Sequence, residues 1–228
     1  MNSSDEIKIF LEIGKKRTFA GAIEWPGWSR SGQDEKTSLQ ALLDYGKRYA
    51  RIPHSAHLEF YPPVDVSAFA VVERIDGDTT TDFGTPGISP LSDNLPLQKA
   101  ELVRLQSLLE ACWQAFDQAA SVAAGKELRL GPRGGGRTRE GIIHHVQEAE
   151  IAYLGQLGVK LKKNGHVDPV GEMIQSRKAI QEALASAVRG EIPVRGPRGG
   201  LHWTPRYFVR RAAWHVLNHA WEIEDRIL

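Results

Sequence analysis

The chain has 228 residues and a formal net charge of +1; 41% of its residues are hydrophobic and 25% are charged. This globular composition leaves room for one large or two small domains. It contains no apolar run of membrane-spanning length and no signal-peptide pattern at its start, so we expect a cytoplasmic protein without a membrane partner. The single cysteine, Cys112, excludes an internal disulfide and a cysteine-rich zinc site, and its apolar surroundings predict a core position.

The charge is distributed unevenly along the chain. Residues 1–94 hold 10 basic and 14 acidic residues, and residues 95–228 hold 19 and 14. Much of the positive charge lies in two short Gly/Arg loops, which favours a local anion site over a nucleic-acid surface. Contact with an RNA or DNA backbone is the weaker alternative.

The first part of the chain contains both the alternating hydrophobic pattern of strands and the pattern of an amphipathic helix. Alternating residues predict strands over 7–13 and 18–24, and Trp25-Pro26-Gly27-Trp28 predicts a turn. An amphipathic helix is expected over 34–49, followed by strands over 57–61 and 68–75. These elements form a predicted α/β domain over 1–75. Residues 76–95 show no period and many turn formers, and are expected to be a structured linker.

The remainder, 96–228, has a helical period throughout. The predicted helices cover 97–124, 138–157, 170–189 and 204–227. Short connections between four helices favour an up-down-up-down four-helix bundle. The predicted fold class is therefore a small α+β domain followed by an all-α bundle.

The N-terminal domain resembles a known family. Residues 19–32 read Phe-Ala-Gly-Ala-Ile-Glu-Trp-Pro-Gly-Trp-Ser-Arg-Ser-Gly and precede an acidic helix start with Leu39-Gln40-Ala41-Leu42. This strand–turn–helix pattern, over roughly 7–50, resembles HicB-like domains. Members often act as antitoxins and carry a separate DNA-binding module, which is not visible here. The resemblance therefore implies a small interaction domain, or one that folds over the site of the bundle.

Three histidines are candidate metal ligands. His215 and His219 lie four residues apart on the last predicted helix, so their imidazoles share one face. His145 lies on the apolar side of the second predicted helix, which an up-down-up-down bundle makes parallel to the last one. Three imidazoles with an open fourth position are typical of catalytic metal sites. The alternative is that all three are ordinary bundle histidines without a metal.

The histidine pattern also carries a family resemblance. A histidine followed by Val146 on helix two and a His-x-x-x-His pair on helix four resemble the DinB/YfiT-like four-helix-bundle metalloproteins over roughly residues 95–228. The resemblance implies nickel, zinc or another divalent ion bound through His145, His215 and His219. It also implies activation of a low-molecular-weight thiol for transfer or isomerisation, and formation of a homodimer.

Two acidic residues accompany the histidines. Glu148 follows His145 by three positions and Glu222 follows His219 by three. Each carboxylate could orient an imidazole, supply a fourth ligand or act as a proton-handling group.

The Gly/Arg loops, 131–137 and 195–200, each precede a histidine-bearing helix. Parallel helices would place both loops at one end of the bundle. Arg133, Arg137 and Arg198 would there form an anion clamp for a small acidic molecule. The sequence thus predicts a metal-dependent, thiol-using transferase or isomerase, or a hydrolase, acting on a small anionic substrate. The alternative is a non-catalytic binding or regulatory protein in which the bundle is a scaffold.

Overall fold

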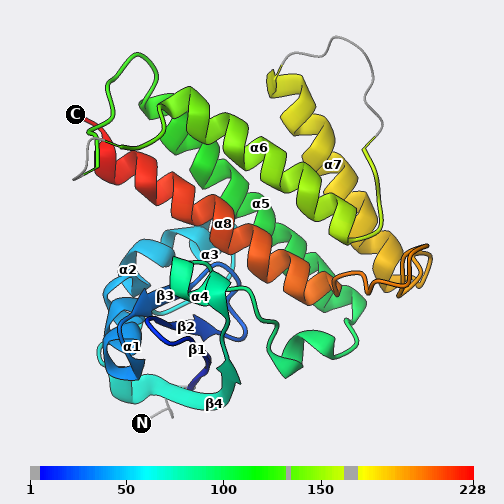
Figure 1. Cartoon of the computed structure of the whole chain (residues 1–228), viewed down its shortest axis with the longest axis horizontal. Coiled ribbons are helices and arrows are strands. Elements are labelled where there is room, and N and C mark those ends of the chain that lie inside the picture. The colour runs from blue at the N-terminus through cyan, green and yellow to red at the C-terminus, as the bar shows by residue number, and fades with distance from the viewer. Residues whose placement is uncertain (1–5, 132–134, 162–168) are drawn as a thin grey trace. The chain divides into compact units, whose positions relative to one another are not determined.

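The computed structural model describes residues 6–131, 135–161 and 169–228 and divides the chain into two compact units, Met1–Leu95 and Pro96–Leu228 (Figure 1). The first unit contains a four-stranded sheet with helices, and the second contains helices. The expected mixture of an α/β part and a helical part is therefore confirmed. No helix in the described ranges is long and apolar enough to cross a membrane.

The sheet of the first unit has the order β3-β2-β1-β4. Its strands are β1 (Ile7–Ile13), β2 (Thr18–Ala22), β3 (Ser29–Gly32) and β4 (Phe69–Asp76). β2 pairs antiparallel with both β1 and β3, whereas β4 pairs parallel with β1. β3 was not expected, because its sequence Ser-Arg-Ser-Gly contains no apolar residue that would mark a strand.

The helix expected over 34–49 is two consecutive helices, α1 (Glu35–Asp44) and α2 (Gly46–Tyr49), and α3 (Arg51–Ser55) follows. Asp34 caps α1, since its side chain accepts a hydrogen bond from the Thr37 amide. The strand expected over 57–61 is wrong: the segment is irregular and His57 has a left-handed φ of 55°. Its apolar alternation serves packing instead, because Phe60 lies against Trp25, Trp28 and Tyr49.

Hydrogen bonds to the buried carboxylate of Glu12 hold the segment 76–95 against the sheet. It contains α4 (Thr79–Phe83) and the 3-10 turn η2 (Leu91–Asn94). Glu12 on β1 accepts hydrogen bonds from the Thr81 hydroxyl at 2.5 Å and from the backbone amides of Gly87 and Ile88 at 3.0 and 3.2 Å. Burial raises the pKa of Glu12, and these hydrogen bonds oppose the shift.

The helices of the second unit are close to those expected. They are α5 (Lys99–Val122), α6 (Arg139–Gln156), α7 (Pro169–Val188) and α8 (Pro205–Arg226). Thr138 and Thr204 cap α6 and α8, accepting from the amides of Gly141 and Tyr207. Pro205 occupies the first turn of α8, where its missing N–H costs nothing.

The directions of these helices correct the predicted topology. The carbonyl of Arg137, before α6, accepts from Arg226 at the end of α8, and the carbonyl of Gln156, at the end of α6, accepts from the amide of Trp203, before α8. α6 and α8 are therefore antiparallel, so the expected up-down-up-down order is wrong. α8 also contacts α5: Glu101 near the start of α5 pairs with Arg206 near the start of α8, so these two helices are parallel.

The connection between α6 and α7 explains the difference. Gln147 hydrogen-bonds to Glu172 and Glu150 pairs with Arg177, so α6 and α7 also run in the same direction. Two successive parallel helices cannot be joined by a short turn, because the chain must return over the length of the first helix, here roughly 27 Å at 1.5 Å per residue.

An ionic cluster, buried at Glu150 and exposed at Asp117, joins three helices of this unit. Arg177 on α7 contacts Asp117 on α5 at 2.7 Å and Glu150 on α6 at 3.3 Å, and its guanidinium lies 5.3 Å from the ring centroid of Trp113. Burial raises the pKa of Glu150 to about 7, and the charge of Arg177 opposes that shift. Cys112, in α5, is fully buried as expected.

Candidate metal centre

Three histidines converge between α6 and α8, which contact each other in the second unit (Figure 1). The Nε2 atoms of His145 and His215 are 3.2 Å apart, and one ligand nitrogen from each of His145, His215 and His219 lies within 4.8 Å of the others. Among the residues that the structure describes, these three histidines form the group of potential ligands that could hold a metal ion.

The antiparallel arrangement brings the three residues level. His145 lies six residues after the start of α6, and His219 lies seven residues before the end of α8. At 1.5 Å per residue these positions are about 9 and 10 Å from helix ends that lie side by side. The convergence that parallel helices were expected to give is therefore produced by helices of opposite direction.

The nitrogen spacing suits a tetrahedral ion. Two nitrogens that each lie about 2.0–2.1 Å from a tetrahedral zinc are roughly 3.4 Å apart, and the His145–His215 separation is 3.2 Å. Because all three nitrogens fall within 4.8 Å, the longer separations close with a movement of about 1 Å. Nitrogen donors of this kind suit zinc, nickel, cobalt and copper better than magnesium or calcium.

Burial favours the uncharged form of His145 and His215, which is the form that binds a metal. His215 and His219 are each 7% exposed, and His145 is partly exposed. Burial lowers the pKa of His215 to about 2, with the charges of His219 and Arg211 adding to the effect. Burial also lowers the pKa of His145, and the positive charge of Arg137 contributes.

Glu222 is the carboxylate that the structure places against the triad. Its Oε2 lies 2.8 Å from Nδ1 of His219, and its Oε1 accepts from Arg226 at 2.6 Å. These contacts, the hydrogen bond to His219 first, lower the pKa of Glu222, so it is ionised and fixes the proton of His219 on Nδ1. The Nε2 lone pair of His219 is thereby left for a metal. Arg226 is itself held by the carbonyls of Arg129 and Arg137.

Glu148, the other predicted carboxylate, is not brought to the triad. Its side chain is 67% exposed and lies 3.4 Å from Nδ1 of His144, which is 70% exposed. This is a solvated i,i+4 pair on the outer side of α6.

The predicted anion clamp is not assembled. Because α6 and α8 are antiparallel, the loops 131–137 and 195–200 lie at opposite ends of α6, beside Arg226 and Gln156 respectively. Arg137 is exposed and close enough for its charge to act on His145. Arg198 is exposed in the distant loop, which closes on itself through the Gly196 and Gly200 backbones, and Arg133 lies outside the described residues.

Two further residues flank the triad and were not predicted. The Tyr153 ring lies 5.7 Å from that of His215, and the Arg211 guanidinium lies 5.5 Å from the Tyr153 ring centroid. The signal was present in the sequence, since Arg211 precedes His215 by four residues and Tyr153 follows His145 by eight. Both residues extend the helix faces on which His215 and His145 lie.

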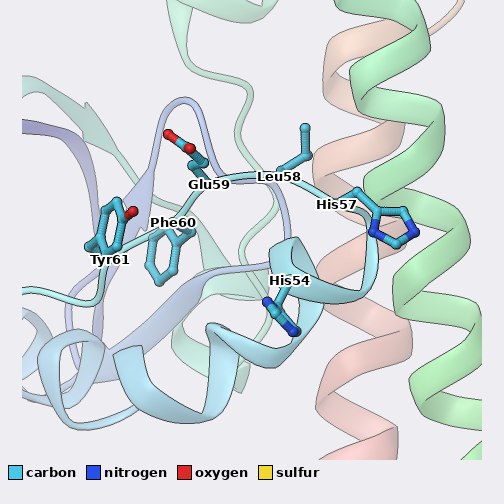
Figure 2. Close-up of a pocket in the computed structure, with 6 residues that line it drawn as sticks. All are labelled: His54, His57, Leu58, Glu59, Phe60 and Tyr61. Atoms are coloured by element: carbon cyan, nitrogen blue, oxygen red, sulfur yellow. The ribbon is translucent and has the colours of Figure 1, made fainter.

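The first unit contains a separate pocket of about 370 Å³, lined by His54, His57, Leu58, Glu59, Phe60 and Tyr61 (Figure 2). None of these residues was predicted to be functional. The two imidazoles do not face each other in Figure 2, and neither belongs to the three-ligand group. This pocket therefore provides no metal site.

No known protein family, curated protein or solved structure matches the chain. Its function is therefore inferred from the triad and the residues around it.

Proposed function

We propose that the second unit is a metal-binding four-helix bundle of the DinB/YfiT-like kind and that His145, His215 and His219 hold a divalent ion such as nickel or zinc. The observation that carries this proposal is the convergence of three ligand nitrogens within 4.8 Å. The lowered pKa of the buried His215, which favours its uncharged form, and the Glu222–His219 hydrogen bond support it.

We further propose that the protein is a metal-dependent enzyme. Three protein ligands leave a position for an exogenous group, and a bound divalent ion lowers the pKa of a thiol or water in that position. A low-molecular-weight thiol would make the protein a transferase or isomerase, and water would make it a hydrolase. The partly exposed His145 and the nearby positive charge of Arg137 favour a small anionic substrate.

The protein residues around the ligands have distinct tasks in this proposal. Glu222 orients His219 and keeps its Nε2 free of a proton, and Arg226 holds Glu222 in place. Tyr153 packs in a T-shaped arrangement against His215, with ring centroids 5.7 Å apart, and helps to position that imidazole.

Elemental analysis of protein purified without a histidine tag tests the proposal. We expect about one equivalent of a transition metal in the wild type and little in His215→Ala. His144→Ala is the matched control, since His144 adjoins His145 but is exposed and points away from the triad. Sub-stoichiometric metal in the wild type, or equal loss in the control, would contradict the proposal.

If metal is present, thiol-dependent chemistry is tested next with a panel of low-molecular-weight thiols and electrophiles. We expect turnover that disappears on chelation and returns when the ion is restored. Activity that is indifferent to chelation would contradict the enzymatic part of the proposal and leave metal binding intact.

A second function is supported by the first unit. This unit exposes large apolar side chains, among them Val64 at 94%, Phe83 at 90% and Val72 on the sheet-edge strand β4. Exposed apolar side chains would be available to a partner, as a HicB-like interaction domain in a non-catalytic protein would require. Metal-free wild-type protein without thiol-dependent activity would favour this function over the first.

A further inference from the structure

Arg211 is a cation without an anionic partner in the part of the chain that the structure describes. Its Nη1 is buried and makes no hydrogen bond, and its guanidinium lies over the rings of Tyr153 and Trp214 at 5.5 and 4.9 Å. By contrast, Arg177 and Arg226 each pair with a carboxylate. Aromatic faces stabilise a guanidinium but supply no anionic oxygen, so the buried Nη1 of Arg211 has no acceptor among the described residues.

The position of Arg211 places this cation beside the triad. Arg211 lies one helical turn before His215 on α8, and residues four apart on a helix have Cβ atoms roughly 5–6 Å apart. Tyr153 contacts both side chains, with its ring 5.7 Å from that of His215. Arg211, Tyr153 and His215 are therefore one continuous group along the α6–α8 contact.

We propose that Arg211 binds the carboxylate of an organic anion whose other end, a thiol or hydroxyl, reaches the metal position. This inference rests on the proposed metal centre and adds the class of ligand and the residue that selects it. A guanidinium with a buried, unused N–H is costly unless an anion satisfies it. Its planar fork of donors matches a carboxylate with two parallel hydrogen bonds.

The spacing limits the size of this ligand. With Arg211 and His215 one turn apart, the carboxylate and the metal-binding group are separated by a few ångströms, which corresponds to a spacer of about two or three carbons. 3-Mercaptopropionate has this form. Its methyl ester is a matched probe, because it keeps the thiol and the spacer but removes the negative charge.

The test measures the binding of both probes to cobalt(II)-loaded full-length protein. Cobalt(II) takes zinc-like sites, and a bound thiolate gives a sulfur-to-cobalt absorption band that can be titrated. We expect the wild type to bind the acid roughly tenfold to a hundredfold more tightly than the ester, the range of a charged hydrogen bond. Arg211→Gln should bind both equally, and Arg211→Lys should keep part of the preference.

The control variant is Lys178→Gln, which removes one positive charge from the exposed side of α7. It should keep the wild-type preference. Equal affinities of acid and ester for the cobalt-loaded wild type would overturn the role of Arg211 without any variant, and so would an unchanged preference in folded Arg211→Gln. Failure of the wild type to take up cobalt would overturn the metal centre itself, together with this inference.

Discussion

Replacing Glu222 by glutamine tests the tautomer that the triad requires. The carboxylate bridges His219 at 2.8 Å and Arg226 at 2.6 Å. His219 and Arg226 contact different carboxylate oxygens, and the single oxygen of an amide can occupy only one of these two positions. If the oxygen turns to Arg226, the amide nitrogen faces Nδ1 of His219 and favours the tautomer protonated on Nε2, where the metal should bind.

The expected effect is a tenfold to hundredfold loss of metal affinity, or about 1.4–2.7 kcal/mol, which is typical of outer partners of metal-binding histidines. Competition with a chromophoric chelator at pH 7 measures it. Glu148→Gln is the matched control, since Glu148 has the same spacing from its histidine but pairs with the exposed His144. Its metal affinity should stay within about twofold of the wild type.

A thermal unfolding curve of each metal-free variant separates this effect from misfolding. If folded Glu222→Gln bound metal as tightly as the wild type, Glu222 would not set the tautomer of His219. Equal loss of affinity in Glu148→Gln would show that the orienting role does not belong to the carboxylate that contacts His219.

Three further predictions concern buried groups away from the triad. Because the pKa of Glu150 is raised to about 7, the native state holds a proton that the unfolded chain releases near pH 4.5. The lowered pKa of His215 acts in the opposite sense over this range, so urea titrations should compare the metal-free wild type with metal-free Glu150→Gln. The free energy of unfolding of the wild type should fall by about 3 kcal/mol relative to that of the variant between pH 4.5 and 7, and a constant difference would contradict the raised pKa. Glu12→Ala removes the acceptor of the Thr81 hydroxyl and of two backbone amides. It should destabilise the first unit by about 2–4 kcal/mol in equilibrium denaturation. An unchanged midpoint would show that these hydrogen bonds do not contribute to stability. Burial raises the pKa of Cys112 far above its usual range, so Ellman's reagent should label it only as the protein unfolds; rapid labelling of the native protein would contradict its core position.

The sequence predicted those features that depend on local chemistry. The caps at Thr138 and Thr204-Pro205 placed the starts of α6 and α8 within one residue, because capping is decided by a few adjacent groups. The spacing of His215 and His219 likewise predicted their shared face. Both features need only the geometry of a single helix.

The wrong predictions concern features that depend on how distant parts of the chain are arranged. Short connections predict alternating helix directions, but the contacts of α6 show that it runs parallel to α7 and antiparallel to α8. The prediction of a Gly/Arg clamp was wrong for the same reason. The three histidines still come together, because His145 and His219 lie at similar distances from the neighbouring ends of α6 and α8. β3 and the segment 57–61 failed because apolar alternation reports burial and not pairing.

The separation of the ligands along the chain has a consequence for folding. His145 and His215 are 70 residues apart, and α7 lies between them in sequence. A coordinated ion would tie these distant points together as a disulfide does, restricting the denatured chain by closing a long loop. The free energy of unfolding of the second unit would then rise with the logarithm of the free ion concentration. The time for which the protein stays folded would therefore depend on how much metal is available.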